Sequence, residues 1–330
     1  MKIRKIALIT FAIVFSISAC NRNKNQEVKE KQEDKPALAT YPFDADSAFH
    51  FVKAQTDFGP RVPNTEAHRL CAAYLSSTMS KYCDTVIVQP FIANTYDGKK
   101  LDSRNIIASF NPQNTNRILL GAHWDSRHTA DQDPNPDNWN KPIDGANDGA
   151  SGVGVLMELA RQLSMNKPSV GIDIIFFDAE DYGTPSSVNI PGDWWCLGSQ
   201  HWARNKHTPG YKAQYGILLD MVGAYNATFY HEGVSARYAP NILSKVWGIA
   251  YQLGYGNYFI NSPANYITDD HYYINTIAKI PMINIVHQDK STNTGFFPYW
   301  HTLQDNITQI DKNTLDAVGK TLMTVIYSEQ

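Results

Sequence analysis

Strand-like and helix-like patterns of apolar residues alternate along most of this chain. Runs of apolar and β-branched residues, which indicate strands, occupy 84–91, 104–110, 117–125, 170–180, 215–223 and 279–287. Apolar residues at helical spacing mark 67–82, 150–163 and 313–330. Because the two kinds of segment alternate, we predict an α/β fold in which helices cover both faces of a central sheet.

Two of the predicted helices have an apolar side that should face the core. In 67–82 the spacing places Leu70, Tyr74 and Leu75 together on one side. In 313–330, which we interpret as a closing helix, the residues expected to point inward are Leu315, Val318, Leu322 and Val325.

Polar residues gather where the apolar strands end. Four strand-like runs close on polar residues, which are, in chain order, His123 and Asp125, Glu180 and Asp181, Asp220, and Asn284 and His287. In open α/β sheets ligands bind at the carboxyl ends of the strands, because the loops there converge on a crevice. We therefore expect the binding site at this edge of the sheet.

Several further acids and histidines belong to the same group. Asp148 lies in "GANDGASG" (145–152), a glycine-rich turn that leads into the 150–163 helix, and Asp269, Asp270, His271 and His301 follow later. So many carboxylates in one crevice would repel each other and raise their pKa values. A divalent metal removes this conflict, and Asp or Glu together with His is a ligand set that suits zinc.

The adjacent pair Glu180 and Asp181 indicates catalysis at such a metal. One carboxylate can bind the metal while its neighbour stays free as a general base or acid. A solvated turn at a strand end would explain this pair alone. It would not explain Asp148, Asp220 and "WHT" (300–302) at matching ends.

The first forty residues have the pattern of a targeting segment. "MKIRK" is basic, "IALITFAIVFSI" is apolar but short for a membrane-spanning helix, and "SAC" places small residues before Cys20. We predict a signal peptide over 1–19, a lipidated Cys20, a polar tether over 20–40 and a single catalytic domain over 41–330. The protein would be an exported bacterial lipoprotein, held on the periplasm-facing side of a membrane. The alternative is a plain signal peptide with a coincidental cysteine.

Composition argues against nucleic acid as a partner, but it does not decide whether the cysteines are paired. The chain of 330 residues is 43% hydrophobic, enough for a sizeable core, and has a formal net charge of −3. The sequence contains no basic stripe of the kind that would indicate nucleic-acid binding. Cys71 and Cys83 could form a disulfide in an exported protein, or could stay, with Cys196, as buried thiols.

The order of motifs resembles a known enzyme family. "AHWDS" (122–126), "GANDGASG" (145–152), "FFDAED" (176–181), "LLDMVGA" (218–224) and "WHT" (300–302) are similar to the zinc-dependent M28-type exopeptidase fold. "TDDHYY" (268–273), Trp300 directly before His301, and the insertion "GTPSSVNIPGDWWCLGS" (183–199) resemble its glutaminyl cyclase branch. The resemblance spans about residues 45–330 and implies a mixed sheet between helix layers.

This resemblance also implies a site and a reaction. One zinc per chain would be held by Asp148, Asp181 and His301, with Glu180 as the free acid and base and Asp220 and Asp269 as a hydrogen-bonded pair. The substrate would be a peptide or protein whose first residue is Gln, converted to pyroglutamate with release of ammonia. Apolar walls would come from Trp300, Ile267, Met221, Phe296 and one of Trp194 and Trp195. Residues that support the site from behind would be His123, Asp125 and Asn284, and a monomer is expected.

Some positions depart from the pattern of the animal cyclases. Asp181 stands where they usually have Glu, and Ala122 and Val153 stand where they carry a disulfide. Asn284 replaces an active-site His, so its amide can hydrogen-bond but cannot titrate.

Two other functions fit the same residues. A di-zinc aminopeptidase would hold a second zinc through His123, Asp220 and a bridging Asp148. The aromatic wall and the 268–273 motif disfavour it. A metal-stabilised binding lipoprotein without turnover would have no need for the free carboxylate of Glu180.

Overall fold

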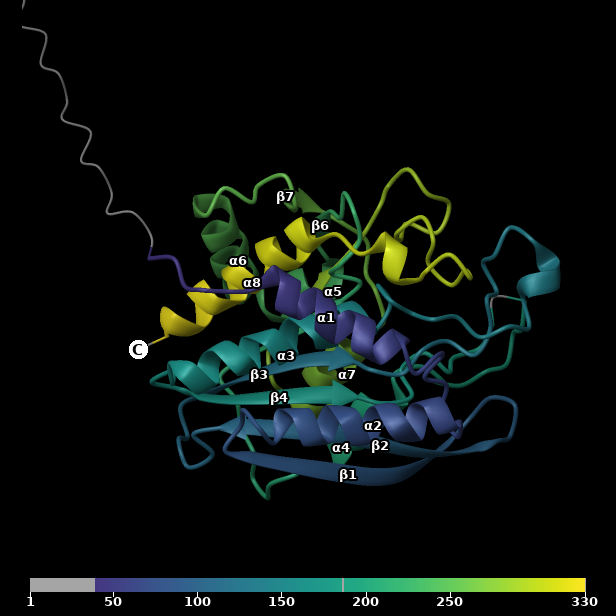
Figure 1. Ribbon diagram of the computed structural model, residues 1–330, viewed down its shortest axis with the longest axis horizontal. Helices are drawn as coiled ribbons and strands as arrows, with labels where there is room; N and C mark the ends of the chain where they lie inside the picture. Colours follow the sequence, from purple (N-terminus) through teal and green to yellow (C-terminus); the bar gives the residue numbers. More distant parts are fainter. Residues whose placement is uncertain (1–38, 186, 330) are drawn as a thin grey trace, which may run out of the picture. The chain divides into compact units, whose positions relative to one another are not determined.

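The computed structural model describes residues 39–185 and 187–329, which belong to one compact unit. A six-stranded mixed sheet forms its centre (Figure 1), in the order β1 (Thr85–Asn94), β2 (Lys100–Phe110), β4 (Gly171–Phe177), β3 (Arg117–His123), β5 (Gly216–Asp220) and β8 (Met282–Val286). β2 pairs antiparallel with both β1 and β4, and the other neighbours are parallel. A separate two-stranded sheet joins β6 (Phe229–His231) and β7 (Phe259–Pro263).

Helices cover both faces of the central sheet. The helices packed on one face are α1 (Ala45–Thr56), α2 (Glu66–Met79), α3 (Ala150–Met165), α6 (Pro240–Gln252) and α8 (Lys312–Tyr327), with α5 (Gly233–Tyr238) beside β8 and α6 (Figure 1). The opposite face carries α4 (Leu197–Arg204), α7 (Asp270–Tyr273) and the π-helical turn η2 (Ile274–Ala278). Short 3-10 turns lie at η1 (Pro136–Asn138) and η3 (Ile307–Gln309). The predicted three-layer α/β fold is confirmed.

Alternation along the strands explains the layers. In β4, Ile172, Ile174 and Phe176 pack into the core beneath α3, whereas Ile175 and Phe177 pack into the core beneath α4. A strand buried on both faces is apolar throughout, which is why the sequence shows continuous apolar runs here.

The sequence predictions for the helices are borne out in part. Leu315, Val318, Leu322 and Val325 of α8 are buried as expected. The prediction for Leu70 was wrong, because this side chain is 40% exposed and α2 instead packs through Cys71, Leu75 and Met79. Helices α1 and α6 and the small sheet were not predicted. Strands β3, β4, β5 and β8 end one to three residues earlier than predicted, so that Asp125, Glu180, Asp181 and His287 lie in the loops that follow, whereas His123, Asp220 and Asn284 belong to the strands.

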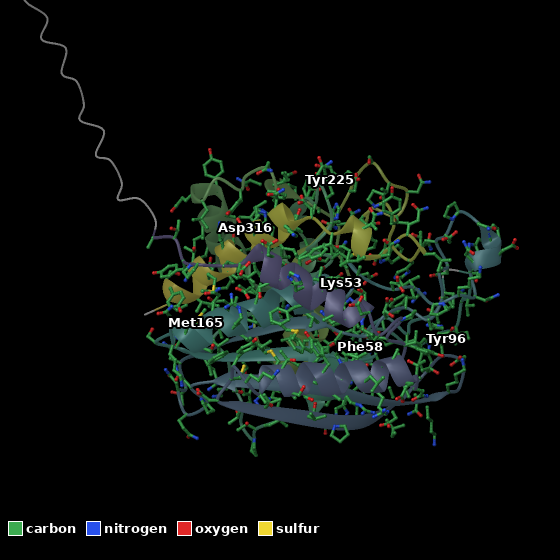
Figure 2. All side chains as sticks on the ribbon, in the orientation of Figure 1. Lys53, Phe58, Tyr96, Met165, Tyr225 and Asp316 are labelled. Atoms are coloured by element: carbon green, nitrogen blue, oxygen red, sulfur yellow. The ribbon has the colours of Figure 1, made fainter. Side chains whose placement is uncertain are left out.

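Exposed side chains and the cysteines complete the description of this unit. Met165, at the end of α3, and Tyr225 project from the surface (Figure 2). Cys71 and Cys83 are free thiols, as is Cys196. Among the described residues, no helix has the length and apolar character that a membrane span requires. The predicted signal peptide, Cys20 and nearly all of the predicted tether lie outside the described residues.

Candidate metal centre and reaction pocket

Four parallel strands bring the predicted site residues to one edge of the sheet. His123 is the last residue of β3, and Asp220 is the last residue of β5. Glu180 and Asp181 follow three and four residues after the end of β4. Because β3, β4, β5 and β8 run parallel, these ends meet, as the sequence predicted.

Asp148 reaches this edge through a loop that its neighbours hold in place. The carboxylate of Asp305 accepts the backbone N–H groups of Asn147 and Asp148 at 2.8 and 3.0 Å. Gly149 has a φ of +95°, and a Cβ there would lie 2.7 Å from the carbonyl oxygen of Asp125. A larger residue at this position would therefore displace the loop.

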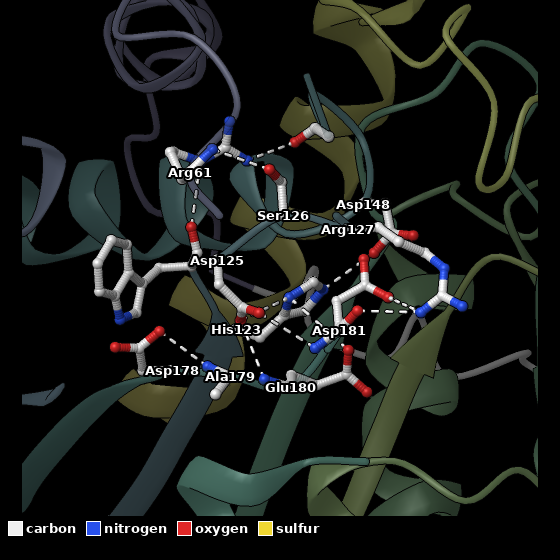
Figure 3. A network of polar contacts seen from close by, with 12 residues as sticks. Arg61, His123, Asp125, Ser126, Arg127, Asp148, Asp178, Ala179, Glu180 and Asp181 are labelled. Atoms are coloured by element: carbon white, nitrogen blue, oxygen red, sulfur yellow. Dashed lines mark hydrogen bonds and ion pairs between the residues drawn. The ribbon is translucent and has the colours of Figure 1, made fainter. Parts of the chain in front are cut away.

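A second turn presents Glu180 and Asp181. The carboxylate of Asp125 accepts the backbone N–H groups of both residues, each at 3.1 Å (Figure 3). The preceding Ala179 has a φ of +53°, so the chain bends sharply as it leaves β4. Asp178 points away from the pocket, and its carboxylate is 2.9 Å from Nε2 of His68. Of the three carboxylates that follow this strand, Asp178 thus belongs to a buried pair with His68, whereas Glu180 and Asp181 belong to the site.

Asp148, Asp181 and His301 converge as one buried set of possible metal ligands. Nε2 of His301 lies 3.2 Å from Oδ1 of Asp181 and 3.6 Å from Oδ2 of Asp148. The Oδ2 atoms of Asp148 and Asp181 are buried and have no hydrogen-bond partner among the described residues. Buried carboxylate oxygens normally have a partner, so this arrangement fits a bound cation.

Residues behind this set orient it. Nδ1 of His301 lies 3.3 Å from Oδ1 of Asp131, the arrangement by which a carboxylate orients a metal-binding imidazole. Arg127 donates to Oδ1 of Asp131 at 2.7 Å. It also donates to the backbone carbonyl of Asp181 at 3.0 Å (Figure 3). Arg127 therefore links the loop of Asp131 to the loop of Asp181.

Glu180 lies beside the ligand set without belonging to it. Burial raises the pKa of Glu180 well above its ordinary value, although the imidazole of His123 opposes this shift. Sγ of Cys196 donates to Oε1 of Glu180 at 3.1 Å, and the backbone N–H of Cys196 donates to the carbonyl of Glu180 at 2.9 Å. A carboxyl group with a raised pKa next to a metal site can both accept and return a proton.

A second possible ligand set shares Asp148. Nε2 of His123 lies 3.0 Å from Oδ1 of Asp148 and 3.4 Å from Oδ1 of Asp220, and all three residues are buried. Burial, together with the nearby carboxylates of Asp269 and Asp148, raises the pKa of Asp220 to about 7 although His123 opposes the shift.

Asp269 faces the same pocket as Asp220, and a neutral partner holds it. Nδ2 of Asn284 donates to Oδ2 of Asp269 at 2.6 Å. The neighbouring Asp270 and His271 were grouped with the site from sequence, but the structure turns His271 toward Glu232, with Nε2 at 2.9 Å from Oε2. Neither Asp270 nor His271 lines the pocket.

The pocket above the ligands has a volume of about 290 Å³ and largely apolar walls. Its aromatic and aliphatic lining consists of Trp195, Trp300, Phe296, Tyr266, Ile267 and Met221. The ring of Trp300 stacks on His301 with a centroid separation of 3.6 Å. Trp195 lines the pocket and Trp194 does not, and Nε1 of Trp194 donates to the carbonyl of Pro191.

Several contributors were not found from the sequence. Asp131, Arg127 and Asp305 act through loops that are distant in sequence from the residues they hold, and nothing within the 183–199 insertion singled out Cys196. The signal that was available is the glycine-rich turn at Asp148, whose buried backbone N–H groups require an acceptor such as Asp305.

The chain also matches a known protein family. The family model described as peptidase family M28 matches residues 105–326. The chain belongs to peptidase family M28.

Two solved structures of bacterial proteins are similar to this chain over most of its length. It is 53% identical to a Zn-dependent exopeptidase from Parabacteroides distasonis ATCC 8503, with a TM-score of 0.87, covering 88% of this chain and 100% of that one. It is 52% identical to the glutaminyl cyclase of Tannerella forsythia, with a TM-score of 0.86, covering 87% of this chain and 99% of that one.

A curated relative is more distant. The glutaminyl-peptide cyclotransferase of Gloydius blomhoffii is 28% identical over 256 residues, covering 67% of this chain. The match spans 64% of that relative's own length. Together these relatives confirm the zinc-exopeptidase-like fold and the resemblance to the glutaminyl cyclases of family M28.

Proposed function

We propose that this protein is a zinc-dependent glutaminyl-peptide cyclotransferase. It converts the N-terminal Gln of peptides and proteins to pyroglutamate and releases ammonia. The observation that carries this proposal is the free carboxyl group of Glu180 beside a three-residue ligand set, at the floor of a small pocket with apolar walls. The names of the bacterial and animal relatives support it.

The residues present fit one zinc ion at Asp148, Asp181 and His301. Bonds of about 2.0–2.2 Å in a tetrahedron put neighbouring ligand atoms about 3.3–3.6 Å apart. The 3.2 and 3.6 Å separations around His301 lie close to this range. When bound, the zinc would act as a Lewis acid on the side-chain carbonyl of the substrate Gln.

Glu180 supplies the proton transfers of the reaction. Its carboxylate accepts a proton as the α-amine of the substrate attacks its own side-chain amide carbon. The same carboxyl group then returns the proton to the departing ammonia. Because both transfers occur within one substrate residue, one group at the pocket floor can serve both.

The remaining residues hold the substrate for this ring closure. Asp220 and Asp269 line the pocket and offer acceptors for the N–H groups of the substrate, with Asn284 fixing the orientation of Asp269. Trp300, Phe296 and Ile267 keep the folded-back Gln side chain compact and exclude water, which would compete with the amine.

A di-zinc aminopeptidase is the second candidate, because the set of His123, Asp148 and Asp220 could hold another metal. One observation argues against it, because His123 does not line the pocket. A binding protein without turnover is disfavoured because Glu180 would then be a buried carboxyl group with a raised pKa and no role.

One assay separates these functions. The soluble domain is incubated with a peptide that begins with Gln and with matched peptides that begin with Ala or Leu, and the products are weighed. The cyclase removes one ammonia from the first peptide and leaves the others intact. Loss of the first residue from the Leu peptide would identify an aminopeptidase.

We further propose that a lipid on Cys20 anchors the protein on the periplasm-facing side of a membrane, with 20–40 as tether and 41–330 as the catalytic domain. The support is the pattern of basic, apolar and small residues before Cys20. Cys20→Ser should move the protein from the membrane fraction to the soluble fraction, because the lipid chain would be lost. Unchanged membrane retention would show that this assignment is wrong.

A further inference from the structure

A second cavity, which we call the side groove, adjoins the reaction pocket. It is lined by residues 263–267 and by residues between 288 and 296, and its volume is about 720 Å³, against about 290 Å³ for the pocket. Tyr266, Ile267 and Phe296 line both cavities. A substrate whose first residue fills the pocket therefore has the side groove next to the continuation of its chain.

Hydrogen bonds and packing hold several positions in the walls of the side groove. The backbone N–H of Gln288 donates to the carbonyl of Thr228 at 2.9 Å, and the hydroxyl of Thr292 donates to the carbonyl of Phe296 at 2.8 Å. On the other side, the ring of Tyr266 packs against Gly233, where a Cβ would lie 2.7 Å from the ring. A preformed groove lowers the ordering cost of binding a flexible peptide.

The chemistry of the side groove suits a peptide backbone. Gln288 lines the groove and is only 6% exposed. Asn265, Asn293 and Thr294 add further amide and hydroxyl groups to the lining.

The charge of the side groove is positive, although the whole chain is acidic. Lys290 is the ionised residue of its lining, which contains no carboxylate. The ammonium group of Lys290 donates to the carbonyl of Pro263 at 3.3 Å and lies 4.2 Å over the ring of Tyr230. Within the described part of the chain it forms no ion pair, and the nearby Asp289 instead accepts from the backbone and hydroxyl of Ser291.

From these contacts we propose that the side groove binds the residues that follow the N-terminal Gln, and that Lys290 selects an acidic side chain at the second or third position. The proposal rests on the proposed cyclase function. It adds a substrate class, peptides with Asp or Glu directly behind Gln. Selection by one exposed ion pair is modest, about two- to fivefold in kcat/KM, and should act through KM because the contact is remote from the reacting atoms.

The test uses the full catalytic domain and peptides with an amidated C-terminus. Gln stands first, and Glu, Gln or Lys stands at the second or third position. Each kcat/KM is divided by that for glutaminamide on the same preparation, so that differences in the amount of active enzyme cancel. The wild type should favour Glu over Lys, and the preference should shrink as salt screens it.

Two substitutions connect the preference to this residue. Lys290→Gln should abolish it, and Lys290→Glu should reverse its order. Lys81→Glu, an equal charge change at an exposed lysine after α2, should leave it intact. A preference that survives Lys290→Glu, or one that Lys81→Glu removes equally, would overturn the proposal.

The outcomes also separate the two proposals. If glutaminamide is not cyclised at all, the proposed function fails. If it is cyclised and the peptides show no order among Glu, Gln and Lys, the side-groove proposal alone fails. The same peptides are also measured with a free terminal carboxylate. A preference seen only for these would show that Lys290 binds the end of the chain, which also overturns the side-groove proposal.

Discussion

The two ligand sets that share Asp148 differ in what surrounds them. In the first set His301 is backed by Asp131, and Arg127 holds both the loop of Asp131 and the loop of Asp181. In the second set His123 is surrounded by acids, with Asp125 at 3.6 Å and Glu180 at 3.9 Å from its Nδ1. The comparison shows that a set of suitable donor atoms is not yet a metal site. The residues behind the donors decide which set is organised for a cation.

The lining of the reaction pocket also distinguishes the two ligand sets. The pocket is lined by Asp148, Asp181 and His301 of the first set, but not by His123 of the second. Asp220 lies opposite the first set and shares the pocket with Asp269. We therefore interpret Asp220 as a group that contacts substrate and His123 as the residue that holds Asp220 and Asp148 apart.

The largest expected effect comes from Glu180→Gln. This change keeps the shape of the side chain but removes proton transfer, so turnover should fall by about two to four orders of magnitude. Zinc content should be unchanged, because Glu180 is not a ligand in this account. Near-normal cyclisation by the variant would contradict the assigned role of Glu180.

The next effect concerns the aromatic wall. Trp300→Ala should lower kcat/KM by about ten- to a thousandfold, because the substrate is no longer held compact beside His301. Zinc should stay bound. A purely structural Trp would instead lower the melting temperature and leave per-molecule activity intact, so melting temperature, zinc content and cyclisation rate are measured on one preparation.

Support behind the first ligand set can be tested by metal affinity. Asp131→Asn weakens the acceptor that orients His301, and zinc affinity should fall by about ten- to a hundredfold in competition with a chelator. Asp125→Asn is the matched change at the carboxylate that accepts the backbone N–H groups of Glu180 and Asp181. If both variants retained wild-type zinc affinity, the contrast between the two sets would lose its basis.

The smallest expected effect separates two adjacent tryptophans. Trp195→Ala should lower kcat/KM, because its ring lines the pocket and stacks over Arg127 at 4.6 Å. Trp194→Ala should change kcat/KM by less than about twofold, since surface substitutions rarely have large effects. Equal losses in both variants would show that the loop around 194 and 195 is arranged differently during catalysis.

Much of the site could be predicted because strand ends are a local signal. An apolar run that stops at His123, Glu180 or Asp220 marks both the strand and the edge where ligands bind. Asp131 and Asp305 could not be found in this way, because they support residues more than a hundred positions away in the chain. The choice between Trp194 and Trp195 depends on a single loop turn, which no periodicity encodes.

Burial on both faces made the central strands easy to recognise from their continuous apolar runs. The buried side of helix α2 was harder to predict, because its apolar pattern is weak. Its buried side uses Cys71 and Ala72 together with Leu75, whereas Leu70 faces solvent. Small residues there give a weak apolar pattern, so the more hydrophobic Leu70 was wrongly expected inside.

The number and position of bound metals test the central claim most directly. We would load the domain with zinc, measure the metal per chain and locate it by anomalous scattering in a crystal. The account predicts one zinc, between Asp148, Asp181 and His301. Two well-occupied zinc ions bridged by Asp148, with the second on His123 and Asp220, would contradict it and favour the aminopeptidase.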